Sequence, residues 1–64
     1  MLYEISVIYY NYNPADNKRY RTEMLVVGED NARELGAKCM GADNVVQVDV
    51  VDALTGEVIE SWAE

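Results

Sequence analysis

The sequence contains one segment with helical periodicity, and this segment lies between two pairs of segments that alternate in polarity as β-strands do. One short helix can cover only one face of the four-stranded sheet that such a chain predicts. At 64 residues the chain is long enough for a single small domain. The expected fold class is therefore α+β, over residues 1–64, with ββαββ order, an antiparallel sheet and a helix packed on one face.

The first two strands are expected to form a hairpin. Apolar residues fill alternate positions from Leu2 to Tyr12, and a second strand is expected from Lys18 to Val27. The residues from Asn13 to Asn17, which include Pro14, favour a reversal of the chain. This part of the sequence therefore predicts two long strands joined by a short turn.

The register of this hairpin follows from the charged residues of the second strand. Placing Tyr12 opposite Arg19 keeps Arg21 and Glu23 out of the core. The same register puts Arg21 opposite Tyr10, where a cation–π pair is expected. A shift by one residue would exchange the two faces of the second strand.

The helix is expected from about Asn31 to Met40. Asp30 is the predicted N-cap, and Gly41 is the predicted left-handed residue after the last turn. Small and apolar residues recur on one side of this segment, which should therefore face the sheet. These residues are Ala32, Leu35, Gly36, Cys39 and Met40.

The second hairpin is expected from Val45 to Trp62, with a turn at Gly56. In its first strand, Val46, Val48 and Val50 should face the core, and Gln47 and Asp49 should face away from it. Val50 is expected opposite Ile59, because the other orientation would bury Glu60 without a partner. This choice places Val58, Glu60 and Trp62 on the face without a helix.

A right-handed crossover between the two hairpins predicts the strand order 2-1-3-4. The two most apolar strands then lie in the middle, and the more charged second and fourth strands form the edges. Pairing between two fourth strands remains a second route to a dimer, because a short edge strand exposes unpaired backbone groups.

The face without a helix is expected to carry a contiguous apolar and aromatic surface, which is typical of protein interfaces. The predicted interface residues are Ile8, Tyr10, Tyr12, Leu25, Val51, Val58 and Trp62. Four carboxylates are interspersed among them, namely Glu4, Glu23, Asp49 and Glu60. We expect a non-catalytic interaction module that forms a homodimer through this face.

Charge and cysteine content restrict the partners and the compartment. Twelve acidic and five basic residues give a formal charge of −7, which disfavours a nucleic acid or an anionic membrane as the direct partner. The single Cys39 favours a reducing compartment, and the cytoplasm is the expected location. Residues 1–12 do not read as a signal peptide, and no apolar run is long enough for a membrane span.

Catalytic and metal-binding patterns are sparse in this sequence. There is no histidine, and Cys39 has no base at a recognisable spacing, so neither an enzyme nor a cofactor is expected. One cysteine without histidines does not supply a zinc site. The pairs Asp16-Asn17 and Asp43-Asn44 are interpreted as turn residues rather than as calcium ligands. Asp49 and Glu60 are interpreted as solvated carboxylates.

In its small size, its acidity and its lack of catalytic residues, the chain resembles accessory proteins encoded by phages and mobile elements, without sharing a specific motif with them. That resemblance implies an alternative function. The acidic and aromatic face would occupy a basic groove that a host protein uses for nucleic acid, and its carboxylates would stand in for phosphates.

Overall fold

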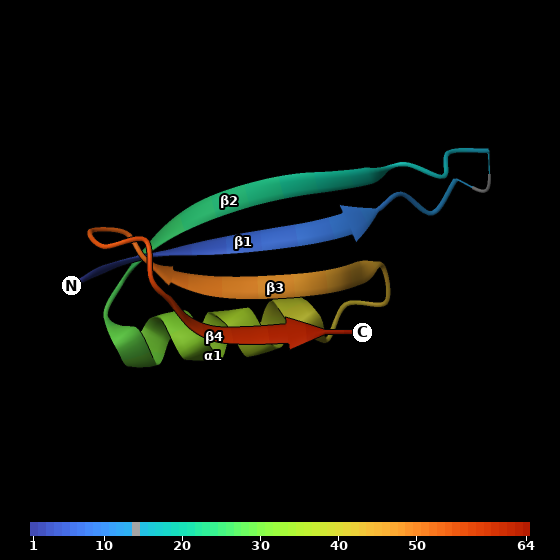
Figure 1. Ribbon diagram of the computed structural model, residues 1–64. Coiled ribbons are helices and arrows are strands. Elements are labelled where there is room, and N and C mark those ends of the chain that lie inside the picture. The colour runs from blue at the N-terminus through green and yellow to red at the C-terminus, as the bar shows by residue number, and fades with distance from the viewer. Residues whose placement is uncertain (14) are drawn as a thin grey trace.

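The computed structural model describes residues 1–13 and 15–64. Its elements in chain order are β1 (Leu2–Tyr10), β2 (Arg19–Val27), α1 (Glu29–Met40), β3 (Val45–Asp52) and β4 (Val58–Ala63). The strands form one antiparallel sheet in the order β2-β1-β3-β4, and α1 packs on one face of it (Figure 1). The predicted fold class and strand order are confirmed.

The core lies between α1 and the two central strands. Ile5, Val48 and Val50 are fully buried, and Ala32 of α1 is buried against them. These side chains are branched residues of central strands and a small residue of the helix, so the helix can approach the sheet closely. The sheet-facing side of α1 is the one predicted, because Leu35, Gly36, Cys39 and Met40 also pack there or are buried.

The register of the first hairpin differs from the prediction by two residues. Tyr10, and not Tyr12, lies opposite Arg19, so Ile5 lies opposite Met24 and Val7 opposite Thr22. A shift of two residues leaves every side chain on its predicted face. The connecting loop is longer than expected, and Figure 1 shows it projecting beyond the start of β3.

Side chains within this loop explain its length. The backbone N–H of Ala15 donates to Oδ1 of Asn13 at 3.0 Å, and that of Lys18 donates to Oδ1 of Asp16 at 2.9 Å. The second bond satisfies an N–H that a longer β2 would have paired with β1, and the first stabilises the turn. The predicted turn also included Pro14, which lies outside the described residues.

The helix begins two residues earlier than predicted. Its N-cap is Gly28, with a φ of 92°, and no side chain caps the first turn, so the prediction of Asp30 as the N-cap was wrong. A positive φ suits glycine, which turns the chain sharply from β2 into α1. The prediction for Gly41 was also wrong, because its φ is −73° and its N–H bonds to the carbonyl of Lys38.

A β-bulge changes the start of β3. Ile8 lies opposite Gln47, whereas Tyr9 lies opposite Val45, so Val46 is the extra residue. Val45 is buried in the core and Val46 is only half-buried, which corrects the predicted inward position of Val46. Val48 and Val50 face the core as predicted.

The orientation of β4 was predicted wrongly. Val50 lies opposite Glu60, and Val48 lies opposite Trp62, so Glu60 and Trp62 are on the face that α1 covers. Glu60 is not unpaired there, because Arg33 of α1 donates a hydrogen bond from Nη1 to Oε1 of Glu60. The ion pair removes the cost of burial on which the opposite orientation was based.

Trp62 occupies the space that Gly36 leaves. A Cβ atom added at Gly36 would lie 2.7 Å from Cζ3 of Trp62 and 3.0 Å from Cγ2 of Val50. The absence of a side chain at this helix position therefore admits the indole ring between α1 and the sheet. A second bulge places Val58 opposite Val51, which returns Val58 to the face without a helix.

Candidate interaction surface

The face of the sheet opposite α1, called here the helix-free face, is formed by alternate residues of all four strands. β1 contributes Leu2, Glu4, Ser6, Ile8 and Tyr10, and β2 contributes Arg19, Arg21, Glu23, Leu25 and Val27. β3 and β4 contribute Gln47, Asp49, Val51, Val58, Ser61 and Ala63. The cross-strand registers divide this surface into an apolar end, a polar band and an aromatic end.

The apolar end consists of Leu2, Leu25, Val27, Val51 and Val58. Leu2 is 45% exposed, Val58 52%, Leu25 64% and Val27 69%. The cross-strand partners are Leu2 with Val27 and Val51 with Val58, and Glu4 lies between Leu25 and Val51. Exposed apolar side chains of β1, β2 and β4 therefore gather at one end of this face, with half-buried Val51 beside Val58 and Glu4 among them. Such a composition suits an interface core.

The polar band crosses the middle of the sheet and consists of Ser6, Arg21, Glu23, Gln47, Asp49 and Ser61. Nε of Arg21 donates to Oγ of Ser6 at 2.8 Å and lies 3.2 Å from Oε1 of Glu23. Asp49 accepts hydrogen bonds from the hydroxyl of Ser61 at 2.5 Å and from the amide of Gln47 at 3.2 Å. The polar groups of this band thus find partners within the chain.

The aromatic end lies beside the first hairpin loop. The guanidinium of Arg19 lies over the ring of Tyr10, 5.1 Å from its centroid, so Arg19 takes the cation–π position predicted for Arg21. The hydroxyl of Tyr10 donates to the carbonyl of Asp43 at 3.3 Å. Tyr10 and Ile8 are half-buried, so this end offers less free apolar surface than the apolar end.

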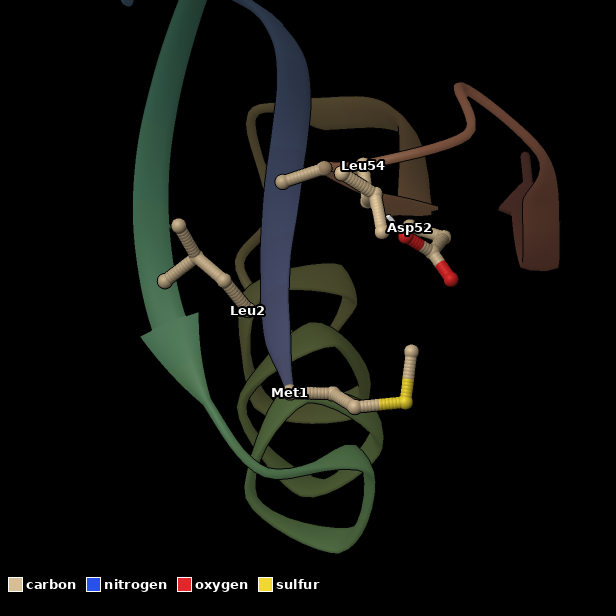
Figure 2. A pocket seen from close by; sticks show the side chains of 5 residues that line it. Met1, Leu2, Asp52 and Leu54 are labelled. Carbon is tan, nitrogen blue, oxygen red and sulfur yellow. Dashed lines mark hydrogen bonds between the residues drawn. The ribbon is translucent and has the colours of Figure 1, made fainter.

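A shallow hollow of about 290 Å³ adjoins the apolar end and is lined by Met1, Leu2, Asp52, Ala53 and Leu54. Figure 2 shows Met1 just before β1, Leu2 at its first position, and Asp52 and Leu54 at the end of β3 and in the following turn. Oδ1 of Asp52 accepts the backbone N–H of Leu54 at 2.9 Å, so this carboxylate shapes the turn.

The predicted interface residues fall into two groups. Ile8, Tyr10, Leu25, Val51 and Val58 lie on the helix-free face. The other two lie elsewhere, because Tyr12 is in the loop after β1 and Trp62 packs against the core.

The predicted acidic contacts divide in the same way. Glu4, Glu23 and Asp49 lie on the helix-free face, and Glu60 lies on the covered face. Asp49 lies opposite Ser61 and Glu60 opposite Val50, so the two carboxylates are on different faces of the sheet.

Two residues of the apolar end, Leu2 and Val27, were not among the predicted interface residues. Both lie at strand termini and face each other across β1 and β2. Leu2 shares the alternate positions of Glu4 and Ile8, so the sequence pattern indicates its place on this face. Its pairing with Val27 depends on the register, which the loop length sets.

Charged groups on the covered face are held in a separate chain of contacts. Nε of Arg33 lies 3.2 Å from Oε2 of Glu29. The hydrogen bond to Glu60, followed by the bond to Glu29, raises the pKa of Arg33. The hydroxyl of Tyr3 lies 3.4 Å from Oε1 of Glu29, and burial followed by the charges of Glu29 and Asp52 raises the pKa of Tyr3. The Tyr3 hydroxyl and the Arg33 guanidinium stay protonated at neutral pH. Through Glu29 and Glu60 they link β1, α1 and β4.

Comparison with known protein families, with curated proteins and with solved structures gives no match. In the described residues, 1–13 and 15–64, acidic residues and the cysteine form no cluster of three or more that could hold a metal ion. The helix of the structure falls short of the length and apolarity that a bilayer crossing requires.

Proposed function

We propose that this protein is a small, non-catalytic interaction module that associates with a second copy of itself through the helix-free face. The observation that carries the proposal is the apolar end, where large side chains of β1, β2 and β4 stay exposed on the face opposite the covered core. In such an arrangement the apolar end forms the centre of a two-fold symmetric interface, and the polar band forms its rim.

The charge of the helix-free face supports a second copy of the chain as the partner. Three carboxylates, of Glu4, Glu23 and Asp49, stand beside the guanidiniums of Arg19 and Arg21 on this face, so its formal charge is −1 although the chain carries −7. A nearly neutral face can approach its own copy without strong repulsion.

The same distribution bears on the alternative, an acidic inhibitor that occupies a basic groove. Such an inhibitor would concentrate its carboxylates on the binding face, whereas here Arg21 pairs with Glu23 and Glu60 lies on the covered face. The overall charge of −7 still supports a protein partner over a nucleic acid. The single Cys39 supports the cytoplasm as the location.

Sedimentation equilibrium of the wild type and of the double variant Val27→Gln, Val58→Gln tests the proposal. These two exposed residues of the apolar end lie on the outer strands β2 and β4, and glutamine adds polarity without charge. The wild type should dimerise at micromolar concentrations. The variant should have a Kd raised by roughly a thousandfold, since each of the four substituted side chains of the dimer loses ~1 kcal/mol of buried apolar contact.

The matched control is Ala37→Gln on the exposed side of α1, which should associate as the wild type does. Raising the salt concentration should preserve or strengthen the dimer, because apolar burial is not screened. A wild type that stays monomeric at high micromolar concentration contradicts self-association. A dimer that weakens steeply with salt would instead support an association based on charge.

A further inference from the structure

The two edges of the sheet are protected to different degrees. β4 has six residues, carries the inward-pointing charge of Glu60 and pairs with β3 through a β-bulge. β2 has nine residues, contains neither proline nor glycine, and pairs with β1 without a shift in register. Short length, bulges and inward charges are the usual protections of an edge strand, so β2 is the edge suited to pairing.

The backbone groups that β2 presents outward can be identified from the sheet hydrogen bonds. The N–H of Gly28 donates to the carbonyl of Met1 at 2.8 Å, so even-numbered residues of β2 bond to β1. Odd-numbered residues of β1 bond to β2 for the same reason, and the bond from Ala53 N–H to the carbonyl of Leu2 is consistent with this. The outward N–H and C=O groups of β2 therefore belong to its odd-numbered residues, from Arg19 to Val27.

We propose that β2 pairs antiparallel with β2 of a second copy of this chain, with Thr22 on the two-fold axis. Outward groups bond only when odd-numbered residues lie opposite odd-numbered residues. An axis at Arg21 or at Glu23 would place each of these residues opposite its own copy, which brings like charges together. An axis at Thr22 places Arg21 opposite Glu23 twice and so matches the charges.

The contacts around Arg21 and Glu23 are compatible with this register. Nε of Arg21 bonds to Ser6 and Glu23 within the chain, and the guanidinium has further N–H donors that can reach Glu23 of the second copy. Both side chains are exposed, at 61% and 48% of their surface. The two copies would thus form a cluster of four alternating charges on the helix-free side of the joint.

On the covered face, the side chains of β2 also leave room for β2 of a second copy. Thr22 is exposed, and Tyr20 and Met24 are half-buried on the covered face of β2. The proposed axis places Tyr20 opposite Met24 of the second copy, an apolar pair suited to adjacent strands. α1 packs most extensively on β3, two strands away, and much less on β2. The result is one continuous sheet made of two four-stranded halves.

This pairing uses a surface other than the apolar end and goes beyond the proposed function. Charge reversal tests it in the Val27→Gln, Val58→Gln background, where association through the apolar end is weakened. Arg21→Glu puts two carboxylates opposite each other in the homodimer, and Glu23→Arg puts two guanidiniums opposite each other. Each variant alone should associate at least about tenfold more weakly than its parent, whereas an equimolar mixture should form a heterodimer.

Native mass spectrometry distinguishes the two homodimers from the heterodimer, and circular dichroism checks that both variants are folded. Recovery of the heterodimer in the mixture supports the pairing through Arg21 and Glu23. Homodimers of the single variants as strong as the parent, a mixture without heterodimer, or a parent that is monomeric at millimolar concentration would overturn the proposal.

Amide hydrogen exchange gives a second readout that association through the apolar end does not produce. The N–H groups of Arg21 and Glu23 point outward, so they should exchange at least about tenfold more slowly in concentrated protein than in dilute protein. The N–H of Thr22 bonds to β1 and serves as the internal control, with slow exchange in both samples. Fast exchange at Arg21 and Glu23 in the concentrated sample would overturn the edge pairing and leave the proposed function unaffected.

Discussion

The two faces of the sheet are built from alternate residues of the same strands, and they differ in what their apolar side chains contact. On the covered face, Val48, Val50 and Trp62 pack against α1, and Arg33 pairs with the one inward carboxylate on β4. On the helix-free face, Leu25, Val27 and Val58 stay exposed. Large apolar residues on the covered face therefore serve the stability of the monomer, and those on the helix-free face are available for association.

Trp62→Ala should have the largest effect on the free energy of unfolding, because Trp62 lies on the covered face. It removes a large ring between α1 and the sheet and should reduce the free energy of unfolding by about 2–4 kcal/mol, at the lower part of the range for buried aromatic residues because Trp62 is half-buried. Urea denaturation followed by circular dichroism measures the change. Val58→Ala on the same strand is the control, with an expected loss below about 1 kcal/mol.

If Trp62→Ala instead kept the wild-type stability and dissociated a dimer, the indole would lie on the helix-free face. That outcome would restore the orientation of β4 that the sequence suggested. It would also remove Gly36 from the explanation of helix packing.

Gly36→Ala is expected to have the next largest effect. The added methyl group would overlap the ring of Trp62, at a cost of about 1–3 kcal/mol, and the better helix propensity of alanine offsets ~1 kcal/mol of this. A net destabilisation of about 1 kcal/mol should appear in urea denaturation of Gly36→Ala. In the Trp62→Ala background the same substitution should become neutral or stabilising, because the overlapping ring is absent.

The Val27→Gln, Val58→Gln variant should show that apolar residues of the helix-free face add little to the stability of the monomer. Because both valines are exposed in the monomer, its free energy of unfolding should stay within about 0.5 kcal/mol per substitution of the wild type. Unfolding is to be measured at a protein concentration low enough to keep both proteins monomeric. A loss of several kcal/mol would place these valines in the core of the monomer.

The smallest expected effect concerns Asp16, in the loop beside the covered face of β2. The hydroxyl of Tyr20 donates to Oδ2 of Asp16 at 2.5 Å and, together with the N–H of Lys18, lowers the pKa of Asp16 below its ordinary value of 3.8. Tyr20→Phe removes the larger cause, so the pKa should rise towards 3.8. An NMR titration of the Asp16 carboxyl carbon measures both values, and equal pKa values in the two proteins would contradict the bond.

The sign of the effect on stability follows from the direction of this shift. The folded pKa of Asp16 lies below the unfolded one, so the carboxylate stabilises the fold above pH 3.8, and this contribution is lost as the pH falls through the folded pKa. In Tyr20→Phe the loss should be complete at a higher pH. The ring of Tyr20 also stacks on Tyr9 with 5.8 Å between centroids, and phenylalanine preserves this contact.

The fold class and strand order could be predicted because they depend on local patterns. The alternation of Val48 and Val50 with polar residues marks a strand, and the spacing of Ala32 and Gly36 marks the side of the helix that faces it. The charges of β2 then identified an edge strand. Each of these signals lies within a short segment of the sequence.

The orientation of β4 could not be predicted, because it depends on a contact between segments that are distant in the sequence. Arg33 and Glu60 are 27 residues apart, and no local pattern shows that they meet. The two bulges, at Val46 and Ile59, change which face the neighbouring side chains of the strand point to. No local sequence pattern indicates either bulge. For the candidate site, the register of the first hairpin, which depends on the bonds of the loop, places Val27 opposite Leu2 and not opposite Glu4.

The most direct test of the central claim, that two copies meet through the apolar end, is an isotope-filtered NOE experiment on a mixture of labelled and unlabelled wild-type protein. It detects contacts between copies only. Intermolecular NOEs are expected among the methyl groups of Leu2, Leu25, Val27 and Val58, and none from methyl groups buried in the monomer such as those of Val48. Intermolecular NOEs confined to the β2 backbone, or none at a concentration where the protein sediments as a dimer, would contradict it.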